Sequence, residues 1–168
     1  VNIELIDINV IENGDLDRFD TIIIGIRAYN VNDMLNSKNE LLFDYANRGG
    51  NLLIQYNTTR NLLTKKLTPF YLNLSRDRVT EEDSPVKILT PLHRALNFPH
   101  KITSEDFENW VQERGLYFPN KWDKSFIPIL SMNDKNENEK FGSLLIGNHG
   151  KGKVIYTGLS FFRQIPSG

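Results

Sequence analysis

Polar side chains follow two apolar runs of the sequence, at residues 21–26 and 51–54, and they carry the clearest chemical potential in the chain. They are guanidinium, phenol and amide groups: Arg27, Tyr29 and Asn30 after the first run, and Gln55, Tyr56 and Asn57 at the end of the second. Such groups form hydrogen bonds and can bind a carboxylate, a phosphate or a sugar. None of them is a strong nucleophile. These residues therefore predict a site that binds a ligand rather than one that attacks it.

The first apolar run is rich in β-branched residues and predicts a strand covered on both faces, and the second predicts another buried strand over 51–57. Between them, residues 40–48 have apolar side chains at helical spacing, and Gly49-Gly50 supplies the stop. Strand, helix and strand within about 40 residues make a βαβ unit with parallel strands. Because the carboxyl ends of parallel strands share one edge, where ligands usually bind, the polar residues above are expected to lie together.

Further candidate ligand-binding residues lie in two later segments. They are two arginines of an alternating charged segment, Arg76 and Arg78, and an aromatic and basic group, Trp110, Arg114, Tyr117 and Trp122. The arginines can bind an anion through their planar fork, or they belong to a solvated loop or hairpin arm at 75–83. The aromatic rings can stack on a sugar, or they pack over the edge of the sheet.

The remaining sequence predicts the other elements of one α/β domain over residues 1–168. Strands are expected at 3–6, 70–74, 86–89 and 127–132, and an antiparallel hairpin at 143–158. Helices are expected at 90–99 and at 104–115, the second ending at Gly115. Residues 116–123 are expected to form an irregular aromatic loop. The two ends of the sequence indicate a piece of a longer polypeptide.

Composition excludes several kinds of chemistry. The chain has no cysteine, which excludes a thiolate nucleophile, a disulfide and cysteine-bound zinc. Its three histidines, His93, His100 and His149, stand in separate segments without metal-site spacing, and no phosphate-binding glycine motif occurs. We therefore expect no metal and no cofactor. A net charge of −1 and the lack of a long apolar run predict neither nucleic acid nor a membrane as partner.

The order of segments resembles a known fold family. The strand FDTIIIGIRAYN, a helix ending in RGG and the strand NLLIQYN look like the class I glutamine amidotransferase-like fold, especially its trehalose-utilisation-type relatives. The resemblance implies a three-layer α/β/α, flavodoxin-like domain with a mainly parallel sheet and a C-terminal antiparallel hairpin. In that superfamily a cysteine follows the second strand, with His and Glu later. The matching position here is Gln55 or Tyr56, which removes the amidotransferase mechanism.

A finer resemblance covers nearly the whole chain. The segments GIRAYN, SRDRVTEED, HRALNFPHKIT, DFENWVQERGLYFPNKWD and GKGKVIYTGLSFFRQIPSG look like those of an accessory domain in PIG-L-type (LmbE-like) deacetylases of Bacteroidetes. The resemblance implies an exported parent protein that removes acetyl groups from N-acetylated sugars with zinc. The family's metal motif, H-P-D-D with a later H-x-x-H, does not occur in these residues. Any deacetylation therefore belongs to another part of the parent.

Three hypotheses follow. The first is a non-catalytic module that binds a saccharide or contacts the adjacent domains of its parent. The second is a degenerate enzyme that binds a sugar or carboxylate through Arg27, Tyr29, Asn57 and Arg114. The third is a structural or dimerising domain, in which the same polar groups only satisfy buried backbone.

Overall fold

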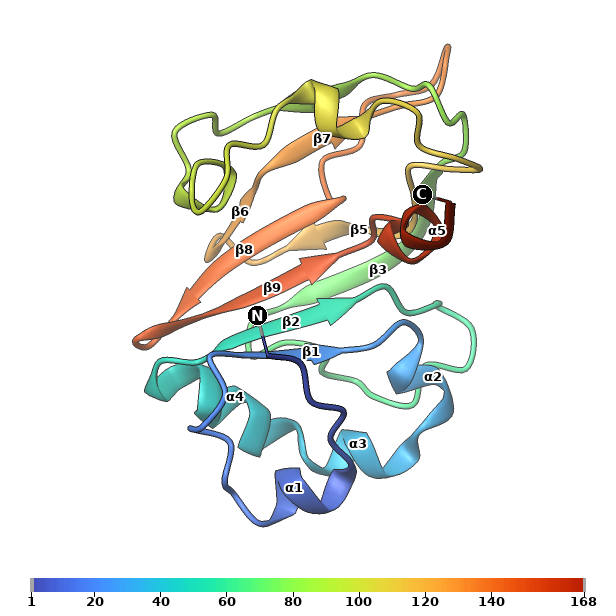
Figure 1. The fold of residues 1–168 in the computed structure, drawn as a ribbon. Helices are drawn as coiled ribbons and strands as arrows, with labels where there is room; N and C mark the ends of the chain where they lie inside the picture. The colour runs from blue at the N-terminus through green and yellow to red at the C-terminus, as the bar shows by residue number, and fades with distance from the viewer. Residues whose placement is uncertain (1, 168) are drawn as a thin grey trace.

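The computed structural model describes residues 2–167, with side chains up to residue 164. A five-stranded sheet forms its centre (Figure 1). Its strands, in spatial order, are β1 (Thr21–Ile24), β2 (Asn51–Gln55), β9 (Gly152–Thr157), β8 (Leu144–His149) and β6 (Phe126–Pro128). The β1–β2 and β2–β9 pairs are parallel, whereas β8 is antiparallel to both of its neighbours. Four of the five strands therefore run in the same direction.

The predicted βαβ unit is confirmed. Helix α4 (Asn39–Arg48) connects β1 to β2, and it ends at Gly49 with φ of 136°, a backbone conformation that favours glycine. The strands pair in register, with Ile22 opposite Leu52 and Ile24 opposite Ile54. The C-terminal antiparallel hairpin of β8 and β9 is also confirmed.

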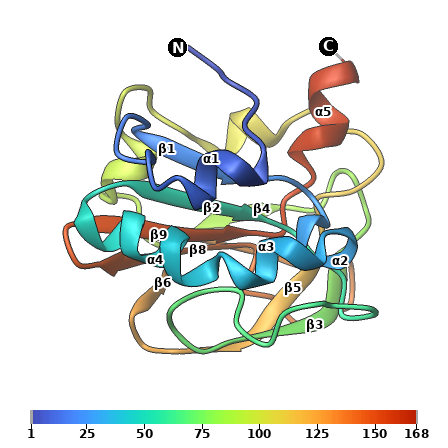
Figure 2. The ribbon, with the colours of Figure 1, turned by 90° about the horizontal axis from the view of Figure 1, so that it is seen from below.

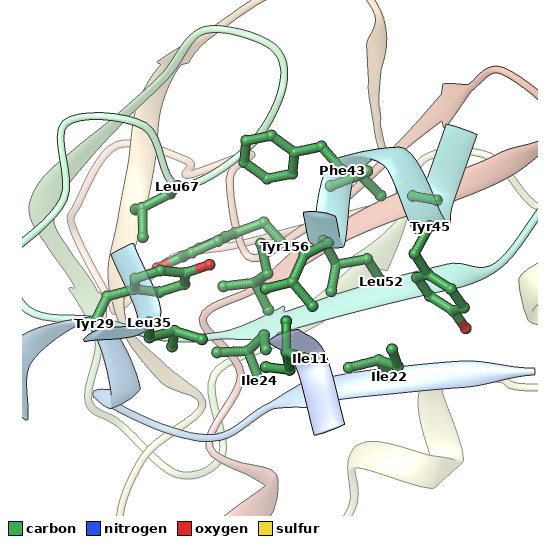
Figure 3. Packing of buried hydrophobic residues seen from close by; sticks show 14 of the residues in the cluster. Ile11, Ile22, Ile24, Tyr29, Leu35, Phe43, Tyr45, Leu52, Leu67 and Tyr156 are labelled. Carbon is green, nitrogen blue, oxygen red and sulfur yellow. The ribbon is translucent and has the colours of Figure 1, made fainter. Parts of the chain in front are cut away.

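Four helices cover one face of the sheet (Figures 1 and 2). They are α1 (Ile8–Glu12), α2 (Ala28–Val31), α3 (Asp33–Ser37) and α4. Alternate residues of the strands point toward them: Ile22 and Ile24 from β1, and Leu52 from β2, pack in one cluster with helix residues such as Phe43 and Tyr45 (Figure 3). Helix α5 (Phe161–Ser167) follows β9.

The other face carries short strands and irregular chain instead of a helical layer. These elements are β4 (Val86–Ile88) paired with β7 (Leu130–Met132), and the 3-10 turns η1 (Arg94–Leu96) and η2 (Ser104–Phe107). The pair of β3 (Leu72–Val79) and β5 (Gly115–Trp122) contributes to both faces, because Leu72 and Trp122 pack against the helix-side cluster, whereas Val79 does not. Leu145 belongs to the helix-side cluster and its neighbour Ile146 to a second cluster with Phe107 and Phe118. Since neighbouring residues of a strand point to opposite faces, the two clusters lie on opposite sides of the sheet.

Two predictions about the N-terminal part are wrong. Residues 2–7 form no helix or strand, and the side chains of Ile3 and Leu5 are 92% and 99% exposed. β1 is not covered on both faces, because it is an edge strand and its Ile23 is 59% exposed. An apolar run therefore did not distinguish a central strand from an edge strand whose second face is open.

The predictions for 104–123 are also wrong. Only Ser104–Phe107 forms a turn of 3-10 helix, which Thr103 caps, and Glu108 then takes an extended conformation. Asn109 and Gln112 have positive φ, so a helix cannot continue through them. Gly115 starts strand β5, and the expected aromatic loop is this strand. Likewise, part of the charged segment 75–83 belongs to β3, and the helix expected at 90–99 is the single turn η1.

Candidate functional site

A group of aromatic and basic residues gathers beyond the carboxyl end of β2. Tyr56 stacks on Tyr117, with ring centroids 6.1 Å apart and an interplanar angle of 7°. Phe162 contacts the Tyr56 ring with a centroid distance of 5.5 Å. The guanidinium carbon of Arg78 lies 5.6 Å from the centroid of the Tyr117 ring, and Arg27 donates its backbone N–H to the Tyr56 carbonyl at 2.8 Å. We call these five residues the strand-end cluster.

The elements explain why this cluster forms. β2 and β9 are parallel neighbours, so Tyr56 after β2 and Phe162 after β9 emerge at the same edge of the sheet. Arg27 follows β1 and therefore reaches the same edge. Tyr117 comes from β5, whose pairing with β3 is interrupted by register shifts between Leu74 and Val79.

Two residues of the cluster have an unfavourable backbone conformation. Arg27 and Tyr117 have φ angles of 55° and 53°. A side chain other than glycine, asparagine or aspartate rarely takes this left-handed conformation, which costs on the order of 1–3 kcal/mol. Strain of this kind often accompanies functional sites. Both residues contact Tyr56, Arg27 through the Tyr56 carbonyl and Tyr117 through the Tyr56 ring.

The electrostatics of the cluster favour an electron-rich ligand. Within residues 2–164, neither Arg27 nor Arg78 forms an ion pair, whereas Arg163 beside them pairs with Glu113 at 2.5 Å. Burial raises the pKa of the Tyr56 hydroxyl, although the positive charges of Arg27 and Arg163 oppose this shift. At neutral pH the phenol is therefore protonated and can donate a hydrogen bond. Its hydroxyl makes no hydrogen bond to the side chains and backbone of the described part.

Three of the predicted ligand-binding residues, Tyr29, Asn30 and Asn57, form hydrogen bonds within the protein at this edge of the sheet. Tyr29 is fully buried: its hydroxyl donates to Asn39 Oδ1 at 2.6 Å, and its N–H donates to Asn57 Oδ1 at 3.0 Å. Burial raises the pKa of this phenol. Asn30 accepts a hydrogen bond from the N–H of Thr58 at 2.8 Å and donates to its carbonyl at 3.0 Å. These amides satisfy backbone groups of the loops.

The remaining predicted residues are dispersed. Gln55 is the last residue of β2 and its carbonyl accepts a hydrogen bond from the side chain of Asn57. Arg76 is exposed on β3. Trp110 packs against the second cluster and Trp122 against the first, on the opposite face of the sheet. The two tryptophans therefore do not form one stacking surface.

Arg114 is 5% exposed and belongs to a different structural feature. Its Nε donates to the Ser84 carbonyl at 2.8 Å, and its Nη1 donates to the carbonyl of Phe107. Asp134 holds the same loop from the other side, because it accepts hydrogen bonds from the N–H groups of Thr80 and Glu81 and from the Ser84 hydroxyl. We call Arg114 and Asp134, with the loop 80–84, the loop clamp.

Sequence reasoning missed Phe162 and Arg163. The signal was present, because both follow the strand 152–157 and its Gly158 closely. The sequence predicts the hairpin of β8 and β9, but it does not show that β9 is also the parallel neighbour of β2. That pairing places the residues after β9 next to Tyr56.

The described residues can also be compared with the requirements of a metal site, a membrane-crossing helix and a nucleophilic site. No group of three or more His, Asp or Glu residues is arranged to hold a metal ion in the described part of the chain. Among the helices of residues 2–167, none has the length and apolar character needed to cross a membrane. The strand-end cluster itself offers donors and rings but no nucleophile of the serine or cysteine type.

Comparisons with known proteins support the fold. No family model matches the chain, and no curated protein matches its sequence. The cytoplasmic protein STM3548 from Salmonella typhimurium shares the fold with a TM-score of 0.55 and 16% identity, over 88% of this chain and 62% of that one. The cytoplasmic protein STM1381 from Salmonella typhimurium LT2 gives a TM-score of 0.54 and 17% identity, over 91% and 66%.

A third structure is larger. Gan42B, a GH42 β-galactosidase from G. stearothermophilus, aligns with a TM-score of 0.51 and 15% identity, over 91% of this chain and 21% of its own. This chain thus spans 62% of STM3548 and about a fifth of the β-galactosidase. At these identities the likeness concerns the fold alone, a mixed α/β domain with a mainly parallel five-stranded sheet.

Proposed function

We propose that this chain is a non-catalytic accessory module that binds a saccharide or carboxylate ligand at its strand-end cluster, beside the catalytic domain of a PIG-L-type N-acetyl-sugar deacetylase. The observation that carries the proposal is the stacked Tyr56–Tyr117 pair, flanked by the exposed side chains of Arg27 and Arg78. Tyr56 is 8% exposed, so a ligand would contact the half-buried Tyr117 ring at its rim, and the guanidinium groups offer donors for the oxygen atoms of the ligand.

Two further observations support the proposal. The catalytic groups that the two resembling families use are missing from the sequence, namely the cysteine of the amidotransferases and the H-P-D-D motif of the deacetylases. The alignment with 21% of a β-galactosidase chain supports the idea that this fold occurs as one part of larger sugar-processing proteins.

We also propose that the domain is a variant of the three-layer flavodoxin-like fold of the glutamine amidotransferase superfamily. Helices α1 to α4 correspond to one outer layer. The irregular segment that holds β4, η1 and η2 takes the place of the second layer, which explains the low helix content of this variant.

An NMR titration tests the proposed function. Uniformly labelled protein is titrated with N-acetylglucosamine, its β-1,4-linked oligomers, glucuronate and glucose. The proposal expects chemical-shift changes that concentrate at Arg27, Tyr56 and Tyr117 with at least one of the acetamido or carboxylate sugars. Shifts that are absent with every sugar, or that avoid these residues, would contradict it.

A second candidate function is assembly with a neighbour, and one observation favours it. Within residues 2–167, β1 pairs with β2 alone, and Ile23 of β1 is exposed along with Ile3 and Leu5 of the N-terminal segment. Unprotected edges of this kind tend to pair with another strand. An adjacent domain of the parent or a second copy would fit there. Analytical ultracentrifugation of the wild type and of Ile23→Lys distinguishes the two partners. If the partner is a second copy, the pure wild type is a dimer and Ile23→Lys is a monomer; if it is another domain, both are monomers.

A further inference from the structure

A hollow of about 540 Å³, whose lining includes no residue of the strand-end cluster, lies beside the segment that leads from β2 into β3. Its volume falls in the range that small-molecule sites occupy. Its walls come almost entirely from one continuous stretch, residues 59–74, and include Thr59, Lys65, Lys66, Tyr71 and Asn73. The sequence pattern gave no indication of this hollow.

The segment that builds the hollow is unusual. Between Gln55 and Leu72 the chain forms neither helix nor strand. Irregular segments longer than about 12–15 residues are uncommon inside compact domains, and they are usually either functional or linkers without a fixed shape. A segment of this length that is held in one shape therefore calls for a functional explanation.

Hydrogen bonds hold this segment against the helices. The side chain of Asn39 in α4 donates to Thr64 Oγ1 at 3.1 Å and to the Lys66 carbonyl at 2.7 Å. The Leu63 N–H donates to the carbonyl of Tyr29 at 2.9 Å. Asn39 and Thr64 are both buried, so these bonds are shielded from water. The hollow is therefore preformed, which lowers the entropy that a ligand must overcome.

The lining has a definite chemical character. It contains two lysines and no aspartate or glutamate. Lys66 is engaged with Glu40 at 2.9 Å, but Lys65 is exposed and forms no ion pair within the described part of the chain. Tyr71 is 61% exposed, which leaves its ring available for stacking. The Asn73 side chain donates to Asn120 Oδ1 at 2.8 Å, which leaves its own amide oxygen as an acceptor.

We propose that this hollow is a binding site for an acidic monosaccharide unit, distinct from the strand-end cluster. Lys65 pairs with the carboxylate, the Tyr71 ring packs against the sugar ring, and the Asn73 amide accepts a hydrogen bond from a hydroxyl. A neutral sugar lacks the partner for Lys65 and binds more weakly. An ion pair at such an exposed position is screened by salt, so the preference for the acidic sugar falls as ionic strength rises.

Isothermal titration and NMR titration with glucuronate and with glucose test the proposal. We expect glucuronate to bind about threefold to fivefold more tightly than glucose at low salt, which corresponds to one exposed charge contact. Lys65→Gln removes most of this preference, and Tyr71→Ala weakens both sugars. Lys101→Gln, which removes an exposed lysine outside the lining, leaves both affinities unchanged.

The outcomes separate this proposal from the one for the strand-end cluster. Arg27→Gly and Arg78→Gln leave binding in the hollow unchanged if the two sites are distinct. The proposal is overturned if glucuronate and glucose bind equally, if neither binds, or if glucuronate binding is lost in the arginine variants and kept in Lys65→Gln. If the hollow does not bind glucuronate, the proposed function is still tested separately by the chemical-shift changes at Tyr56 and Tyr117.

Discussion

The strand-end cluster and the loop clamp use the same residue types in opposite ways. In the loop clamp, Arg114 and Asp134 are 5% and 8% exposed, and backbone groups occupy their hydrogen-bonding atoms. In the strand-end cluster, Arg27 and Arg78 are exposed and form no ion pair among the described residues. The difference indicates where a charge stabilises the fold and where it remains available to a ligand.

The strain follows the same division. The loop clamp contains no residue with positive φ among Arg114, Asp134 and the loop 80–84, whereas the strand-end cluster holds two such residues, Arg27 and Tyr117. Backbone strain of this kind is consistent with a binding role. Substitutions in the clamp should therefore change stability, and substitutions in the cluster should change binding. Four predictions test this division, beginning with the largest effect.

Arg114→Met should lower the free energy of unfolding by about 3 kcal/mol, because it leaves the buried carbonyls of Ser84 and Phe107 without their donor. Urea denaturation followed by circular dichroism measures this change. Arg76→Met, on the exposed surface of β3, serves as the matched control and should change it by less than about 0.5 kcal/mol. Equal effects of the two variants would show that the loop clamp does not stabilise the fold.

Asp134→Asn should lower the free energy of unfolding by about 2 kcal/mol at neutral pH. Burial of the Asp134 carboxylate opposes its ionisation, but the hydrogen bonds from Thr80, Glu81 and Ser84 outweigh this and hold its pKa below the ordinary value. A carboxylate with a lowered folded-state pKa contributes stability above its unfolded pKa, about 3.9, and loses that contribution as the pH falls through the folded value.

The difference between wild type and Asp134→Asn should accordingly narrow as the pH is lowered below about 4. Urea denaturation at a series of pH values provides this measurement. The exposed Glu108, replaced by Gln, is the control and should show no such narrowing. A difference that stays constant with pH would show that the carboxylate charge does not contribute.

Arg27→Gly should raise stability by about 0.5–1 kcal/mol, because glycine takes a φ of 55° without strain, although its larger unfolded-state entropy offsets part of the gain. The same variant should weaken ligand binding at the strand-end cluster. Thermal unfolding and NMR titration measure the two effects. A variant that loses both stability and binding would indicate that Arg27 is structural.

Arg78→Gln should have the smallest effect on stability, below about 0.5 kcal/mol, because its guanidinium group only covers the exposed face of the Tyr117 ring. It should nevertheless weaken binding at the strand-end cluster severalfold. Lys124→Gln, an exposed cation outside the cluster, should change neither. An unchanged affinity in Arg78→Gln would restrict the binding surface to Arg27 and the tyrosine pair.

The sequence was a good guide wherever local chemistry decides the structure. Helical spacing with a glycine stop predicted α4, and the order of strand, helix and strand predicted β1 and β2 as parallel neighbours. It failed for 104–123, where an acidic, aromatic pattern suited a helix but Asn109 and Gln112 adopt positive φ and the chain turns into β5. That outcome depends on pairing with β3, which is distant in sequence.

The candidate site was predicted only in part. Parallel pairing brings Arg27 and Tyr56 to one edge, and this rule is local enough to apply to a sequence. The sequence did not show that Tyr29 and Asn57 are buried and hydrogen-bonded to each other, since burial depends on how the loops pack. Nor did it reveal the hollow beside 59–74, whose shape depends on how Asn39 holds a segment without secondary structure.

The central claim is that the strand-end cluster binds a ligand and leaves its bonds intact. The most direct measurement is an NMR titration of the purified protein with N-acetylglucosamine oligomers, in which protein shifts and free acetate are followed in the same tube. The account predicts shifts at Tyr56 and Tyr117, weakened in Arg27→Gly, and no acetate. Acetate released by the wild type and lost in Arg27→Gly would contradict it.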